Sequence, residues 1–173
     1  MTFTKCEEIK ENSSTGSFQL CPKLYYVDFP KTKKIGINAF AQTKLLTSVF
    51  FPKVESTGTS AFANSNIETV NFPLCTSIGA NCFNPCAKLK EIKIPLCREI
   101  KTGAFSNCTV LEKIFLDGVT AVPTLSTNAL SGTPETLKII VPDALVDSFK
   151  TATNWSTYAN KIIGITEYES TLT

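Results

Sequence analysis

The sequence predicts a mainly-β solenoid in which each turn of about 22 residues contributes one short parallel strand. The first observation is a Phe-Pro or Ile-Pro pair that ends an apolar run at intervals of 21 or 22 residues: Phe29-Pro30, Phe51-Pro52, Phe72-Pro73 and Ile94-Pro95. The second is a set of further apolar positions that recur in the same phase. Because one such unit cannot bury its apolar face alone, neighbouring units must stack around a shared core.

The strand of each turn is the run that reads L-x-x-I-x-F-P. Its last three residues before the proline alternate, so Val70 and Phe72 are expected to point inward and Asn71 outward. One strand per turn stacks into a parallel sheet. Proline has no backbone N–H to donate to that sheet, and Pro73 therefore marks the end of the strand.

Two more anchors complete each turn. An aromatic residue lies five or six residues before each run, and the set is Phe18, Phe40, Phe62, Phe83 and Phe105, with Leu130 as a looser sixth copy. Five residues before that position stands Ile35, Ile78 or Ile100, for which one turn substitutes Thr57. The segment between proline and the next aromatic anchor is rich in small polar residues, so turns or short extended backbone are expected there and no helix.

This pattern resembles the BspA-type leucine-rich repeat, whose unit reads roughly P-x-x-x-x-I-x-x-x-A-F-x-x-C-x-x-L-x-x-I-x-L-P. Residues 73–95 follow it closely, and the resemblance covers residues 5–142. It implies a right-handed leucine-rich-repeat solenoid with little helix on its convex side. It also implies a place among bacterial surface, protist surface or phage-associated proteins, many of them tied to adhesion, and hence a cell-surface or extracellular location.

The chain is expected to form one domain, 1–173, in four parts. Residues 1–30 make an irregular first repeat, in which residues 11–16 are an apparent insertion that forms a bulge. Residues 31–117 make four regular repeats, and residues 118–142 make a divergent last repeat whose period lengthens to 25. Residues 143–173 close the open end of the core as a C-terminal cap, as solenoid ends require.

The cap is expected to consist of short helices. Asp143 is a candidate N-cap for a helix that places Leu145, Val146 and Phe149 on one face. A second helical pattern follows, with apolar residues at Trp155, Tyr158, Ala159 and Ile162, and residues 163–165 would then cover the last sheet edge. The alternative is that Trp155 and Tyr158 form a carbohydrate-stacking platform; the helical spacing favours the cap.

Composition is typical of an ordinary globular domain. Apolar residues make up 43% of the chain and charged residues 18%, with a net charge of +2. This balance argues against disorder and against nucleic acid as a partner. No run of 18 apolar residues is present, so membrane insertion is not expected. The N-terminus lacks the apolar region of a signal peptide, and the sequence is expected to be a piece of a longer protein or a short product exported by another route.

Six of the seven cysteines fall into two columns of the repeat: Cys21, Cys86 and Cys108 follow the aromatic anchor, while Cys6, Cys75 and Cys97 precede the isoleucine anchor. This placement indicates a structural role, as small buried apolar residues. Disulfides between Cys86 and Cys108 or between Cys75 and Cys97 remain open alternatives. No metal site is expected, because Cys82 and Cys86 are the only close pair and the chain has no histidine.

Catalysis has little support in the sequence. The absence of histidine removes the commonest general base and every Ser-His or Cys-His nucleophile. No phosphate-binding loop, dinucleotide fingerprint or nucleophile elbow is present. The chain is therefore expected not to be an enzyme and to need no cofactor.

The predicted function is a binding or adhesion module that presents its strand surface to a protein or glycan, as part of a larger surface protein. The candidate binding residues are the outward ones: Tyr26, Asp28, Phe50, Asn71, Lys93 and Phe115. Large aromatic side chains at outward positions point to contact with a partner or with a neighbouring segment. The alternatives are a structural spacer without a ligand of its own and a location in the reducing cytoplasm, which unpaired cysteines also fit.

Overall fold

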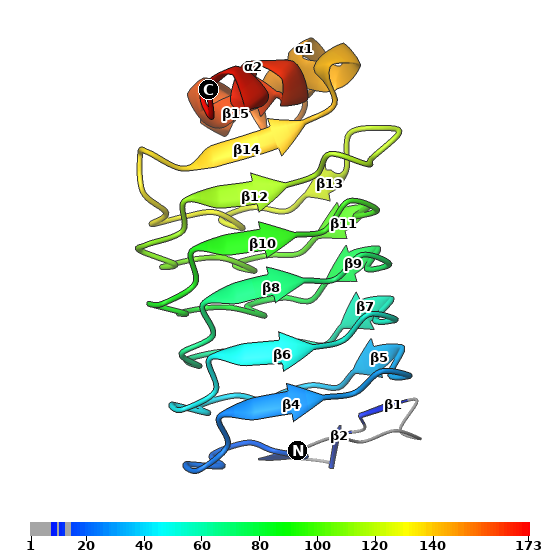
Figure 1. Cartoon of the computed structure of the whole chain (residues 1–173), viewed down its shortest axis with the longest axis vertical. Coiled ribbons are helices and arrows are strands. Elements are labelled where there is room, and N and C mark those ends of the chain that lie inside the picture. The colour runs from blue at the N-terminus through cyan, green and yellow to red at the C-terminus, as the bar shows by residue number, and fades with distance from the viewer. Residues whose placement is uncertain (1–7, 10, 13–14) are drawn as a thin grey trace.

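The computed structural model describes residues 8–9, 11–12 and 15–173 as a stack of turns that rises from the N-terminal end to a helical C-terminal end (Figure 1). One three- or four-residue strand per turn faces the viewer: β4 (Tyr26–Asp28), β6 (Ser48–Phe50), β8 (Thr69–Asn71), β10 (Glu91–Lys93), β12 (Lys113–Phe115) and β14 (Lys138–Val141). The predicted mainly-β repeat solenoid, with a parallel strand of the main ladder in each turn, is confirmed.

A second ladder of two-residue strands runs beside the first. It is parallel throughout and six-stranded: β1 (Glu8–Ile9), β5 (Lys34–Ile35), β7 (Ser56–Thr57), β9 (Ser77–Ile78), β11 (Glu99–Ile100) and β13 (Thr124–Leu125). These strands are the short extended segments expected between proline and the aromatic anchor. Residues 11–16, expected to bulge, supply a two-residue antiparallel pair, β2 (Glu11–Asn12) with β3 (Thr15–Gly16).

The main ladder is interrupted once. β8, β10, β12, β14 and β15 (Ile162–Gly164) form a five-stranded sheet, whereas β4 and β6 pair only with each other. The interruption coincides with a shortened turn, because Phe62 and Phe72 are ten residues apart where Phe40 and Phe51 are eleven apart. Backbone bonds still join the two turns elsewhere, among them the bond from Glu68 N to Thr47 O at 3.1 Å directly ahead of the strands.

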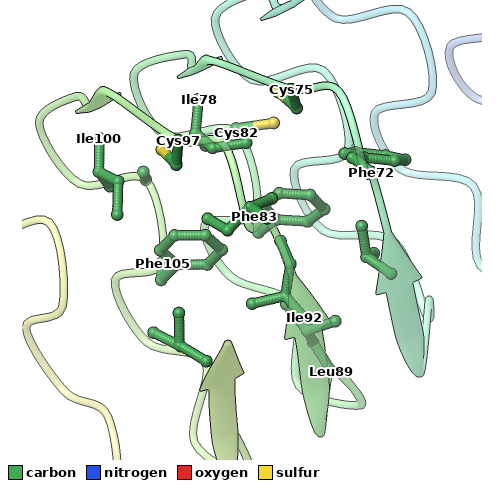
Figure 2. Packing of buried hydrophobic residues seen from close by; sticks show 14 of the residues in the cluster. Phe72, Cys75, Ile78, Cys82, Phe83, Leu89, Ile92, Cys97, Ile100 and Phe105 are labelled. Carbon is green, nitrogen blue, oxygen red and sulfur yellow. The ribbon is translucent and has the colours of Figure 1, made fainter. Parts of the chain in front are cut away.

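The core is organised around a stack of phenylalanine rings from successive turns. The ring centroids of Phe62 and Phe83 lie 5.4 Å apart with an interplanar angle of 4°, and those of Phe83 and Phe105 repeat these values. Figure 2 shows the Phe83 and Phe105 rings among the buried residues of neighbouring turns. Phe18 and Phe40 extend the stack toward the N-terminus. The ring spacing is slightly larger than the strand spacing of about 4.8 Å, so each turn can place its ring directly over the previous one.

The bends on both sides of this ring stack require left-handed backbone. Residues two positions before the aromatic anchor have positive φ in successive turns: Asn38, Ser60, Asn81, Gly103 and Asn128. Asparagine adopts this conformation more readily than most residues because its side chain can bond locally, and glycine does so without a steric penalty. This requirement explains the small polar composition that marks the turns in the sequence.

The C-terminal cap contains four short elements besides β15: the 3₁₀ segments Asp143–Leu145 and Ser156–Lys161, α1 (Val146–Thr151) and α2 (Ile165–Ser170). Trp155 is 1% exposed, and its Nε1 donates to Pro123 O at 2.7 Å. Phe149 packs edge-on against it with centroids 5.0 Å apart. The cap interpretation therefore holds, and a sugar-stacking role for Trp155 is wrong because its ring faces are covered by protein.

Two details of the predicted cap are wrong. Asp143 makes no capping bond to its own helix; its carboxylate accepts from Thr166 N at 3.1 Å and from Thr166 Oγ1 at 2.7 Å, at the start of α2. Ile162 is not helical but begins β15, which pairs in parallel with β14 and covers its edge. No helix in the described part of the chain is long and apolar enough to cross a membrane.

Candidate functional site

The strand face, defined as the outward surface of β4, β6, β8, β10, β12 and β14, is the candidate binding surface. In the regular strands the middle residue points into the core and its two neighbours point outward. Val70 is buried between exposed Thr69 and Asn71, and Ile92 is buried between Glu91 and Lys93. The outward side chains are therefore held on backbone that is anchored from behind by the core.

Strand register aligns the outward residues into two columns. In one column Asp28 pairs with Phe50, and Asn71, Lys93 and Phe115 pair in succession. In the other column Tyr26 pairs with Ser48, followed by the set Thr69, Glu91 and Lys113. The structure thus groups the sequence-predicted residues on one face, but in two halves separated by the missing pairing between β6 and β8.

In the C-terminal half of the strand face, charged side chains on β10 and β12 pair with one another. The Glu91 carboxylate lies 3.5 Å from Lys93 Nζ and 3.8 Å from Lys113 Nζ. Lys93 Nζ also lies 4.9 Å from the ring centroid of Phe115. Each of these partly exposed contacts contributes little to the free energy of unfolding. Together, however, they give Glu91, Lys93 and Lys113 interaction partners within the same chain.

The exposure expected for Phe115 is wrong. Phe115 points outward as predicted, yet it is only 8% exposed, because it forms a small apolar cluster with Ile140 and Ile163 that is covered by α2. Tyr168 of α2 meets its ring edge-on, with centroids 5.5 Å apart. The outward aromatic residue therefore contacts a neighbouring segment of the same chain, one of the two readings open for such a position.

The N-terminal half of the strand face is different. Phe50 is 49% exposed and Tyr26 is half-buried. Asp28 is also half-buried, and its Oδ1 is shielded from solvent without any hydrogen-bond partner. Sequence reasoning missed Tyr25, which precedes β4 and is 68% exposed. The signal was present, since the other turns place threonine, glutamate or lysine at this position of the run.

Sequence reasoning also missed a groove on another side of the solenoid. It measures about 480 Å³ and lies between the loop 118–123 and the preceding turns, where Thr76, Leu96 and Arg98 line it. The lengthened period of the last repeat was the signal, because the additional residues form this loop. Among the residues that the structure describes, no group of three or more His, Cys, Asp or Glu side chains is placed to hold a metal ion.

The cysteine columns lie in and beside the core. Cys75, Cys97, Cys86 and Cys108 are buried and Cys21 is half-buried, while Cys6 lies outside the described residues. All the described cysteines are free thiols, so the alternative disulfides are not formed. Instead, Cys86 Sγ donates to Phe62 O at 3.1 Å and Cys108 Sγ donates to Phe83 O at 3.2 Å. The Cys86 and Cys108 thiols thus form hydrogen bonds with backbone carbonyl groups of the preceding turn.

Burial raises the pKa of these thiols from an ordinary value near 9, to about 12 for Cys75, Cys97 and Cys108 and to about 11 for Cys86. Between pH 9 and 11 the unfolded chain therefore releases protons that the folded chain retains. Below pH 9 ionisation of these thiols should not affect the free energy of unfolding. Above pH 9 the free energy of unfolding should fall as pH rises, by up to about 1.4 kcal/mol per thiol and pH unit. Urea denaturation at pH 8, 9, 10 and 10.5 measures this decline.

The control for this pH dependence is the Cys108→Ala variant, which removes one buried thiol. Its decline above pH 9 should be shallower than that of the unchanged protein, even if its stability at pH 8 is lower. An identical slope in both proteins would contradict the assignment of the decline to buried thiols.

Stacked turns, two parallel ladders and a helical cap around one core define a repeat solenoid of the leucine-rich class. The chain belongs to the BspA-type leucine-rich repeat family, whose repeat region matches residues 9–135 in six copies. The resemblance predicted from the sequence is therefore confirmed. This family provides a repeat scaffold for interaction or surface modules.

Two solved structures are similar. A leucine-rich repeat protein from Bacteroides ovatus is 27% identical with a TM-score of 0.59, and the match covers 81% of this chain and 44% of that protein. A leucine rich cell surface protein from Faecalibacterium prausnitzii is 15% identical with a TM-score of 0.38, over 86% of this chain and 61% of that protein. The chain thus spans less than half the length of the Bacteroides protein. No curated protein matches it significantly.

Proposed function

We propose that this chain is a non-enzymatic binding module that presents its strand face to a protein or glycan ligand, as part of a larger cell-surface or extracellular protein of bacterial or phage-associated origin. One observation carries the proposal: Phe50, a large aromatic residue, is 49% exposed in its outward column, between the polar residues Asp28 and Asn71. Exposed aromatic side chains on rigid surfaces are favoured sites of contact because they bury much area at a small entropic cost.

Rigidity of the strand face supports the same function. The Phe51 ring directly behind the β6 strand is fully buried and packs against Phe29, Phe40 and Phe62. A surface held in this way needs little reordering when a ligand binds, so less of the interaction energy is lost to entropy. The location at a cell surface rests on the family to which the chain belongs.

The proposal predicts that Phe50→Ala weakens ligand binding by about tenfold or more, since central aromatic contacts contribute at least about 1.4 kcal/mol. Ligands are first identified by testing the immobilised protein against a glycan array and a panel of extracellular proteins. Dissociation constants of the variants are then measured by biolayer interferometry. Asn71→Ala, in the same column, should weaken binding less.

The matched control is Leu96→Ala, because Leu96 is 44% exposed and lines the groove away from the strand face. It should leave binding unchanged. Loss of binding in Leu96→Ala with full binding in Phe50→Ala would move the site to the groove. Absence of any ligand across both screens would favour the structural spacer.

A further inference from the structure

The two halves of the strand face differ in whether their aromatic and charged side chains have interaction partners within the chain. In the C-terminal half, the Phe115 ring contacts both the Lys93 ammonium group and the Tyr168 ring. Glu91 forms ion pairs with two lysines. Phe50 occupies the same column three turns earlier, on β6, and the next residue of the column, across the interruption, is the uncharged Asn71. Its ring is half exposed, and no lysine or arginine in the described part of the chain lies over it.

Asp28 is the residue aligned with Phe50 on the neighbouring strand, about 4.8 Å away across the ladder. It is the only charged side chain among the outward residues of β4, β6 and β8. No cationic side chain of the described residues lies within 4 Å of its carboxylate, and Oδ1 has neither solvent nor a donor. A partly desolvated carboxylate in this state is stabilised by an added cation more than a fully hydrated one is.

The lysines near Asp28 in sequence do not fill this role. Lys31 and Lys53 follow the prolines that end their strands, so they belong to the next turn segments, and Lys33 Nζ lies 3.5 Å from Glu55. The strand face at β4 and β6 therefore combines an aromatic ring and an anionic group that both lack a cation.

We propose, on the basis of the proposed binding function, that Phe50 and Asp28 form a subsite for a basic side chain of a protein partner, with arginine as the preferred residue. The guanidinium group stacks on the exposed face of the Phe50 ring and donates hydrogen bonds to the Asp28 carboxylate. The C–C bond that carries the carboxylate rotates readily, so either oxygen of Asp28 can turn toward the donor.

Arginine fits this pair better than lysine for a geometric reason. Its guanidinium is planar, so it can stack on an aromatic ring while its N–H groups point sideways to a carboxylate. Lysine carries a compact charge that can contact the ring, as Lys93 does at Phe115, but cannot bridge to a carboxylate in the same way. The C-terminal half thus shows, within the same column, the cation–aromatic contact that the N-terminal half leaves to a partner.

The experiment uses the full chain labelled with ¹⁵N and two small probes. N-acetyl-arginine amide carries the charge, and N-acetyl-citrulline amide has nearly the same shape without it. The arginine probe should shift the amide signals of Asp28, Ser48 and Phe50 in a saturable way, and the citrulline probe should bind at least about tenfold more weakly. The lysine analogue should fall between them, and added salt should weaken arginine binding.

Two variants and one control locate the interaction. Asp28→Asn and Phe50→Ala should each weaken binding of the arginine probe by about tenfold, whereas Asp147→Asn, on the exposed side of α1, should not. Asp28→Asn should retain the thermal midpoint of the unchanged protein, because the carboxylate oxygen has no native partner to lose. Equal binding of arginine and citrulline, or shifts at other residues only, would overturn the subsite.

Failure of the subsite and failure of the binding function give different results. If Phe50→Ala abolishes capture of a natural ligand but Asp28→Asn changes neither that capture nor probe binding, the basic-side-chain subsite is wrong and the strand-face function stands. If the probe binds as expected but neither variant affects capture of a ligand, the subsite is supported and the strand-face function is overturned.

Discussion

Replacing Phe83 by alanine is expected to lower the free energy of unfolding by about 3–5 kcal/mol, the range for truncating a buried phenylalanine. Phe83 is completely buried and lies between the rings of Phe62 and Phe105, with both pairs of centroids 5.4 Å apart. Its removal leaves a cavity in the middle of the ring stack, which the neighbouring turns cannot close because their backbones are fixed by the two ladders. Urea denaturation followed by circular dichroism measures the loss.

Phe50→Ala is the matched control for that loss. It removes the same side chain from the strand face, where half of it is already in water, so the change should stay within about 0.5 kcal/mol, as for most surface substitutions. Similar losses in the two variants would show that the ring stack is no more important to stability than the surface, contrary to the packing described above.

Replacing Trp155 by alanine is expected to cost a similar amount, about 3–5 kcal/mol. Trp155 connects the cap to the last repeat through its bond to Pro123 O, and its ring fills the space beside Phe149. Without it the cap separates from the core, and the last turn is exposed to water. Circular dichroism and urea titration measure the loss of stability.

Trp155→Phe separates the two contributions of this residue. It keeps most of the packing but leaves the Pro123 carbonyl without its donor, which costs about 1–3 kcal/mol. Thr157→Ala, an exposed position in the same segment, should have almost no effect. If Trp155→Ala were as stable as Thr157→Ala, the cap would not depend on Trp155 for its attachment.

The repeat itself was fully readable from the sequence. The aromatic anchors from Phe40 to Phe105 and the strand-ending prolines from Pro30 to Pro95 recur every 21 or 22 residues, and each interval must return the chain to the same place in the stack. The buried cysteine columns followed from the same reasoning, because their spacing matched the anchors and not a metal site. Only the structure decided that the two disulfides left open by the sequence are not formed. Periodic positions are predictable since one local rule applies to all turns.

The candidate binding surface was predictable only as a list of outward positions. Pleating determines that Phe50 and Phe115 both point away from the core, and the sequence pattern shows this without a structure. It does not show that α2 returns to cover Phe115 while Phe50 stays exposed. For the same reason the sequence predicts Asp143 as the cap of its own helix, although its carboxylate accepts a hydrogen bond from Thr166, 23 residues later.

The sequence by itself determined the solenoid, the position of the strand within each turn and the residues of the repeat core. These features depend on contacts between residues one period apart. Only the tertiary structure decided which outward residues remain free, where the ladder is interrupted and how the cap is attached. These features depend on segments that occur once in the chain, and no repeated pattern encodes where such a segment will pack.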